Sequence, residues 1–155
     1  MSKYDVIIIG AGPAGLTAGL YAGRCGLNTL ILESVTIGGR VLLTERIENF
    51  PGVGKEIKSF DLTKNMEEQV RQFSNVKVLF EEAKSLDCNI KRVFTENNYY
   101  EALGIIIATG SKEKRLQVKG ETEFLGKGVS YCAICDGPLY KDKEVVVVGG
   151  GDSAL

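Results

Sequence analysis

The sequence contains no histidine. Histidine is the most common general base and zinc ligand, so its absence argues against hydrolytic triads and most metal sites, and we expect no metal. No apolar run approaches the roughly 20 residues that a membrane helix needs. The net charge of −1 gives no attraction to nucleic acid or acidic lipid. We therefore expect no membrane and no nucleic acid among its partners. The first residues carry no cleavage signal, so a cytoplasmic protein is the simplest interpretation.

What is present is typical of a globular protein. The 155 residues are 44% hydrophobic and 25% charged, and this length by itself suggests one domain. Glycine is over-represented, because 19 of the 155 residues are glycine whereas the average share is roughly 7%. They occur in short clusters and not in a repeat.

The first 33 residues have the pattern of a β-α-β unit. Tyr4–Ile9 is a short run rich in isoleucine and valine, as expected of a strand buried on both faces. Leu16–Cys25 has helical spacing and is followed by a glycine, and Leu27–Leu32 is a second buried strand. Such units have parallel strands and a right-handed crossover. The resulting prediction is an α/β fold.

A glycine motif, Gly10-x-Gly12-x-x-Gly15, lies between the first strand and the helix. In a dinucleotide-binding turn the first glycine makes the turn, the second admits a pyrophosphate and the third lets the helix pack on the strand. The helix N-terminus then attracts the phosphates. Glu33 follows Gly12 by 21 positions, near the expected spacing of about 20, and its carboxylate can accept hydrogen bonds from a ribose. A glycine turn that only packs is the less favoured alternative.

The middle of the chain continues the same fold. Ser34–Lys58 carries several glycines and a proline and is expected to be an irregular loop, either functional or disordered. Ser59–Phe73 has helical periodicity, and Val76–Phe80 and Leu103–Ala108 have the apolar character of strands. Val93–Tyr99 alternates as an antiparallel edge strand does.

The end of the chain predicts a second nucleotide-binding turn. Ser111–Lys119 is polar and is a plausible crossing between domains. Further along, the expected strand Glu144–Val148 runs into Gly149-x-Gly151-x-x-Ala154, after which a helix should begin. The sequence stops at Leu155, so we expect a fragment of a chain roughly twice as long.

Only two of the four cysteines are close in sequence, Cys132 and Cys135. Two intervening residues allow the disulfide ring of dithiol oxidoreductases. Zinc is a poor alternative because no second pair or histidine completes the ligands, whereas a pair of inert thiols stays open. Asp136 follows the pair and is a candidate proton donor to a leaving thiolate. The isolated Cys25 and Cys88 are expected to be ordinary small apolar residues.

Two nucleotide turns with a cysteine pair between them suggest two cofactors, FAD and NAD(P)H, with electrons passing to a disulfide. Five segments in this order resemble the low-molecular-weight thioredoxin reductases over the whole chain. They are residues 10–15, 47–52, 108–110, 132–137 and 149–154.

The resemblance implies a Rossmann-like FAD-binding domain, a parallel sheet with a small antiparallel sheet, whose first segment is residues 1–112. Residues 113–155 would begin a second Rossmann-like domain, for NAD(P)H, that carries the cysteine pair. It further implies FAD and NADPH as cofactors, thioredoxin as partner, and a homodimer.

The resemblance also implies roles for individual residues. Cys132 and Cys135 would form the redox disulfide, with Cys135 nearer the flavin, and Asp136 would be the general acid. The residues expected to bind the two cofactors are Gly10, Gly12, Pro13, Ala14, Gly15, Glu33, Ser34, Gly38, Gly39, Arg40, Asn49, Thr109, Gly110, Gly149, Gly151 and Ala154.

Arg40 departs from the family, which usually has glutamine after the two glycines. An arginine either keeps the flavin contact or places positive charge near the ring. Three alternatives stay open: a flavoprotein reductase of another dithiol partner, a ferredoxin-linked reductase, or a non-catalytic FAD-binding fragment. An intact second glycine turn disfavours the ferredoxin version.

Overall fold

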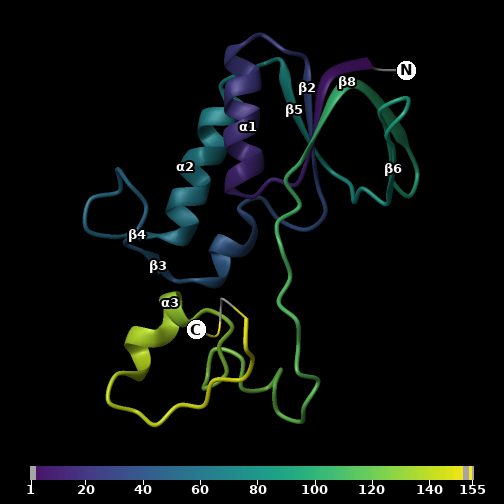
Figure 1. Ribbon diagram of the computed structural model, residues 1–155. Coiled ribbons are helices and arrows are strands. Elements are labelled where there is room, and N and C mark those ends of the chain that lie inside the picture. Colours follow the sequence, from purple (N-terminus) through teal and green to yellow (C-terminus); the bar gives the residue numbers. More distant parts are fainter. Residues whose placement is uncertain (1–2, 152–153, 155) are drawn as a thin grey trace. The chain divides into compact units, whose positions relative to one another are not determined.

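The computed structural model describes residues 3–151 and residue 154, without the side chains of Ile134 and Cys135. The chain divides into two compact units, residues 1–110 and residues 111–155 (Figure 1). Each unit is described below by itself. The assignment of the second unit to an NAD(P)H-binding domain remains a prediction.

The first unit is built on a parallel sheet with the strand order β5-β2-β1-β8. Its strands are β1 (Lys3–Ile9), β2 (Thr29–Glu33), β5 (Val76–Phe80) and β8 (Tyr99–Ile107). β1 lies in the centre and pairs in parallel with both β2 and β8. Its apolar run fits this place, because a central parallel strand is covered on both faces. The predicted α/β fold is thereby confirmed.

Two helices, α1 (Pro13–Arg24) and α2 (Ser59–Arg71), cover one face of the sheet (Figure 1). Small residues on α1 let it approach closely. A Cβ at Gly19 would lie 2.6 Å from Cδ1 of Ile31 on β2, and one at Gly23 would lie 2.7 Å from the ring of Phe73. The close approach of α1 to β2 and to the end of α2 fixes where the helix begins relative to the strand ends.

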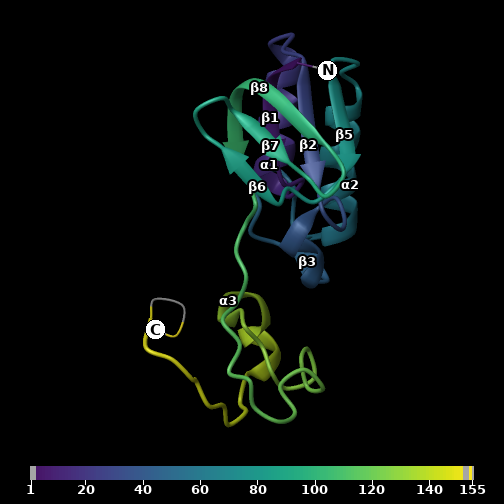
Figure 2. The same cartoon turned by 90° about the vertical axis from the view of Figure 1, so that its right-hand side faces the viewer.

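Beyond β8 the same sheet continues antiparallel through β7 (Arg92–Phe94) and β6 (Ser85–Asp87), and these two strands fold over the face opposite the helices (Figure 2). Val93 is fully buried there in one cluster with Ile7 and Leu30. The prediction of one strand over residues 93–99 was wrong. The chain reverses between β7 and β8, where the Thr95 N–H donates to the Asn98 carbonyl over 2.9 Å.

The segment expected to be an irregular loop, residues 34–58, contains three short elements. They are a 3-10 helix, η1 (Gly39–Leu43), and the strands β3 (Arg46–Ile47) and β4 (Ile57–Lys58). The two strands pair antiparallel and lead directly into α2. The hairpin returns the chain from the end of η1 to the start of α2.

The second unit has little regular structure. It contains α3 (Ala133–Asp136) and a 3-10 helix, η2 (Gly137–Tyr140). The strand predicted at residues 144–148 is absent there, so this prediction was wrong. A strand needs a neighbouring strand to pair its backbone groups, and the described part of this unit offers none. Val146 is accordingly 89% exposed. The helix expected after the second glycine turn falls at residues 152, 153 and 155, which lie outside the described residues.

Candidate functional site

The first glycine turn lies at the carboxyl end of β1. Gly10 has φ +104°, a conformation that side chains disfavour, and a Cβ there would lie 2.4 Å from the Ala108 carbonyl oxygen. Its N–H donates to the Leu32 carbonyl over 2.7 Å. The turn is therefore packed between the ends of β2 and β8, where α/β proteins bind their ligands.

Helix α1 begins from this turn with its N-terminus unoccupied by side chains. Gly12 is the N-cap, Pro13 opens the helix, and the first turn has neither a capping side chain nor an acidic residue. The first intrahelical bond runs from the Leu16 N–H to the Gly12 carbonyl, so the N–H groups of Ala14 and Gly15 have no partner within the helix. This arrangement suits an anion such as a pyrophosphate.

Gly15 holds the helix against the turn. A Cβ at this residue would lie 1.8 Å from the Gly10 carbonyl oxygen and 3.5 Å from Cβ of Ala108. Gly12, in contrast, has open space where a side chain would be, with only Cα of Gly39 at 3.9 Å. The two glycines thus differ: Gly15 is required by packing, and Gly12 leaves room for a ligand.

Glu33 lies at the end of β2 and is only 9% exposed. Its carboxylate accepts from the Ala11 N–H over 2.8 Å and from the Val35 N–H over 2.9 Å, one bond to each oxygen. Each oxygen retains a lone pair, so the carboxylate can still accept from a ribose hydroxyl. These backbone bonds fix the carboxylate beside the glycine turn, which the sequence spacing alone does not show.

The second pair of glycines contacts the first turn. The Gly38 N–H donates to the Ala11 carbonyl over 2.8 Å. Gly39 has φ +62°, and a Cβ there would lie 3.1 Å from Cα of Gly12. Ser34 and Arg40, which flank this segment, are both exposed. The structure therefore brings together two glycine segments that are far apart in sequence.

Other candidate residues lie at different distances from this turn. Thr109 follows β8, and its Cα would lie 3.3 Å from a Cβ at Gly10, while Gly110 has φ +69°. Asn49 is exposed and lies just after β3. Ala11 and Ala108 were missed by sequence reasoning, although both pack against the glycines. Their position inside the recognised motifs was the available signal.

The cysteine segment lies in the second unit. Cys132 is disulfide-bonded, whereas Cys25 and Cys88 are free and exposed thiols. The side chain of Cys135 is not among the described parts of the chain. The Asp136 N–H donates to the Cys132 carbonyl over 3.0 Å, which closes the single turn of α3. Asp136 is half-buried, and its Oδ2 accepts from the Ser130 hydroxyl over 2.5 Å.

A buried carboxylate, Glu121, holds the chain that leads into Cys132. It accepts from the N–H groups of Leu116 and Gln117 over 2.9 and 2.7 Å, and from the Tyr131 hydroxyl. The bond from Tyr131 lowers the pKa of Glu121 despite the opposing effect of burial. The same bond raises the pKa of Tyr131. Sequence reasoning missed this group, since no periodic pattern marks it.

The second glycine turn is only partly described. Gly149 has φ +133°, and a Cβ there would lie 3.5 Å from Cβ of Ala154. The Ala154 N–H donates to the Gly151 carbonyl over 2.8 Å. The small sixth residue of the motif thus lies against the first.

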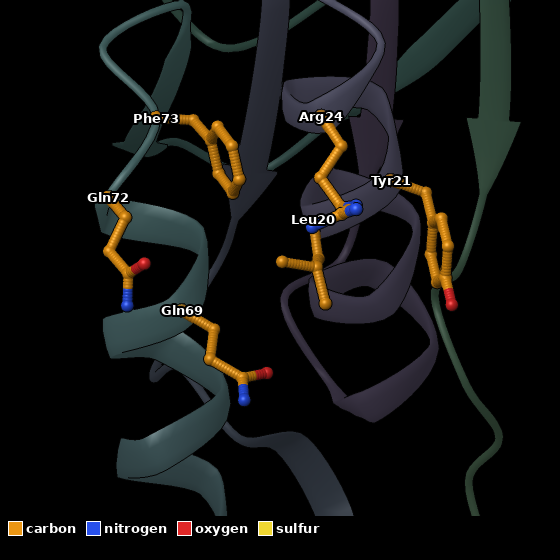
Figure 3. A pocket seen from close by; sticks show the side chains of 6 residues that line it. All are labelled: Leu20, Tyr21, Arg24, Gln69, Gln72 and Phe73. Atoms are coloured by element: carbon orange, nitrogen blue, oxygen red, sulfur yellow. The ribbon is translucent and has the colours of Figure 1, made fainter.

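A shallow groove between α1 and α2 lies away from the glycine turn, toward the end of α1 (Figure 3). None of the candidate site residues lines it. Its lining residues are Leu20, Tyr21, Arg24, Gln69, Gln72 and Phe73.

The parallel sheet, the open N-terminus of α1 and the carboxylate at the end of β2 define a dinucleotide-binding α/β protein. A model of the family described as pyridine nucleotide-disulphide oxidoreductase matches residues 4–155, so the chain belongs to that family.

Individual relatives agree. The chain is 44% identical over 155 residues to a thioredoxin reductase of Treponema pallidum, covering 99% of this chain and 50% of the relative. It is 47% identical to a thioredoxin reductase of Ureaplasma parvum, covering 98% and 49%. A solved thioredoxin reductase of Streptococcus pyogenes matches with a TM-score of 0.85 and 44% identity, covering 98% and 50%. The chain spans about half the length of the curated relatives it matches.

Proposed function

We propose that this chain is the N-terminal part of a thioredoxin reductase, which passes electrons from NADPH through FAD and a Cys132–Cys135 disulfide to thioredoxin. The observation that carries the proposal is the disulfide at Cys132, in a chain whose Cys25 and Cys88 are free. The relatives named above support it, as does the family match.

The residues of the first glycine turn fit FAD. The open N-terminus of α1 offers N–H groups to a pyrophosphate, and the space beside Gly12 is one that a side chain would fill. Glu33 would accept from the ribose, and Gly39 and Thr109 would border the bound group. When bound, FAD supplies a carrier that takes an electron pair from a hydride and passes it to a disulfide.

The remaining roles follow the family resemblance. The turn at Gly149–Ala154 would hold NADPH, and Asp136 would give a proton to a thiolate released from the disulfide. The whole protein would act as a homodimer. The structure describes no helix with the length and apolar character to cross a membrane, among residues 3–151 and 154. The two free, exposed thiols suit a reducing cytoplasm, where we propose that the protein acts.

The test is NADPH-dependent reduction of thioredoxin by the full-length protein that carries this chain, with Cys132→Ser and Cys25→Ser as matched variants. The proposal expects activity in the wild type and in Cys25→Ser, and none in Cys132→Ser. Reduction of a peroxiredoxin-like dithiol partner but not of thioredoxin would replace the partner. Activity only with reduced ferredoxin would replace NADPH, and flavin binding with no disulfide reduction would leave a non-catalytic module.

A further inference from the structure

The side chain of Ser130 contacts the aspartate that follows the cysteine pair. Its hydroxyl donates to Asp136 Oδ2 over 2.5 Å and lies 3.4 Å from the Cys132 carbonyl oxygen. The Cys132 N–H donates to Ser130 Oγ over 3.1 Å. Ser130 thus joins the aspartate to the backbone of the redox cysteine.

We propose that Ser130 is a positioning residue that holds Asp136 beside the cysteine pair in both of its protonation states. The proposal rests on the proposed function, in which Asp136 supplies a proton to a leaving thiolate. Such a donor must stay in place when charged and when neutral, because it gives up and regains a proton in every cycle.

A serine hydroxyl has one hydrogen to donate and two lone pairs that accept. The Cys132 N–H occupies one lone pair in both states. When Asp136 is ionised, Ser130 donates to it. When Asp136 is protonated, its O–H donates to the second lone pair, and the serine hydrogen turns to the Cys132 carbonyl. Each state of the aspartate therefore has a complete set of partners around one oxygen.

The step served is thiol–disulfide exchange with a protein disulfide. One thiolate of the reduced pair attacks a partner sulfur, the partner S–S bond breaks, and the leaving partner thiolate takes the proton of Asp136. The second enzyme sulfur loses its proton to the Asp136 carboxylate and attacks the enzyme sulfur of the mixed disulfide. The mixed S–S bond breaks, the second partner thiolate takes that proton from Asp136, and the partner leaves as a dithiol. Two electrons pass from the enzyme dithiol, which becomes a disulfide, to the partner, which becomes a dithiol.

A neighbouring hydrogen bond provides a control. Tyr131 lies between Ser130 and Cys132 and donates to Glu121, not to Asp136. Two other charged groups affect the pKa of Tyr131: Arg115 lowers it and Glu113 raises it. Tyr131→Phe removes an anchor of the same backbone and leaves both the serine and the aspartate.

The experiment uses the full-length protein, reduced with a dithiol, and measures the pH dependence of alkylation by iodoacetamide together with steady-state disulfide reduction. Removing the carboxylate charge in Asp136→Asn lets thiolate form at lower pH. Ser130→Ala should shift the alkylation midpoint in the same direction by roughly half a pH unit, about threefold in rate below the midpoint. Its kcat should fall about tenfold and that of Asp136→Asn about a hundredfold, with KM unchanged. Ser130→Thr should restore both the alkylation midpoint and kcat to their wild-type values, and Tyr131→Phe should change neither of these two quantities.

The outcomes separate the two proposals. If Asp136→Asn alters both measurements and Ser130→Ala alters neither, the role of Ser130 is overturned and the proposed function stands. The role of Ser130 is also overturned if Tyr131→Phe matches Ser130→Ala, since the effect is then general loosening of the loop. If Asp136→Asn turns over at the wild-type rate, the proton-donor role fails, and the role of Ser130 fails with it.

Discussion

Each of the two units of the chain is stabilised by a different kind of interaction. In residues 1–110 two apolar clusters fill the faces of the sheet, with Ile7, Ile8, Leu30 and Ile31 fully buried. Among the described residues of 111–155 the only buried one is a carboxylate, Glu121. The first unit is stabilised by apolar burial, whereas the second is organised around hydrogen bonds to one charged group. Substitutions should therefore act on global stability in the first unit and on local order in the second.

The largest effect is expected from Leu30→Ala. Leu30 is fully buried in the centre of the sheet, so removing it leaves a cavity and should lower the free energy of unfolding by about 4 kcal/mol. The matched change in the second unit is Val147→Ala, where the side chain is 65% exposed, and its effect should be below about 0.5 kcal/mol. Urea unfolding measures both, and equal effects would end the contrast between the units.

Gly15→Ala should be nearly as damaging. Its new Cβ would lie 1.8 Å from the Gly10 carbonyl oxygen. A backbone oxygen cannot rotate away as a side chain can, so we expect the free energy of unfolding to fall by about 3 kcal/mol. Gly12→Ala meets open space and should change stability little while weakening flavin binding. Unfolding curves and flavin content together separate packing from binding. Full flavin retention in Gly12→Ala would contradict the proposed cradle.

Within the first unit, a polar network joins the end of β5 to the antiparallel part of the sheet. Glu81 accepts from Tyr100 and from Thr95, each over 2.7 Å. Burial and the bond to Glu81 raise the pKa of Tyr100 to about 12. Tyr100→Phe removes one bond to a carboxylate and should lower stability by about 1 kcal/mol at neutral pH.

The pH dependence of this network has a defined sign. Burial raises the pKa of Glu81, but the hydrogen bonds from Tyr100, Thr95 and Asn98 outweigh it, and the pKa is lowered overall from 4.5. The folded pKa is below the unfolded one, so the contribution is complete above about pH 4.5 and is lost as the pH falls through the folded value. Glu81→Gln should therefore flatten the acid limb of the stability curve. An acid limb that Glu81→Gln leaves as steep as in the wild type would contradict this assignment.

The smallest global effect should come from Glu121→Gln. Its consequence should be local, namely faster amide exchange at Leu116 and Gln117, whose N–H groups it holds. The pKa of Glu121 is lowered in the folded chain, so the protection should be present at neutral pH and fall away at acid pH. Hydrogen exchange read at single residues measures it. A large drop in the unfolding free energy of the first unit would contradict the division.

The β-α-β unit was predictable because its pattern is local: an apolar run, a glycine turn, and a helix that repeats every few residues. The prediction placed the helix start at Leu16, whereas it begins at Pro13, because proline opens a helix readily. The pairing of strands depends on segments that are far apart in the sequence. The apolar run at 144–148 resembles a strand, but strand formation depends on a partner elsewhere, which a single segment does not reveal.

The candidate site shows the same limit. Gly10, Gly12 and Gly15 follow from a motif with a known physical purpose. The contact of Gly39 with Gly12 joins segments far apart in sequence, and it could be expected only from the family resemblance. The roles of Ser130, which donates to Asp136, and of Glu121, which accepts from Tyr131, were missed. Hydrogen bonds of this kind across an irregular loop leave no periodic pattern in the sequence.

The central claim is that the glycine turn of the first unit serves a flavin and the cysteines of the second unit a redox disulfide. An anaerobic dithionite titration of the full-length protein, followed by its visible spectrum, tests it most directly. We predict that the wild type takes up one electron pair for the flavin and a further pair for the disulfide, and that Cys132→Ser takes up only the first. A colourless protein, or equal uptake by both proteins, would contradict the account.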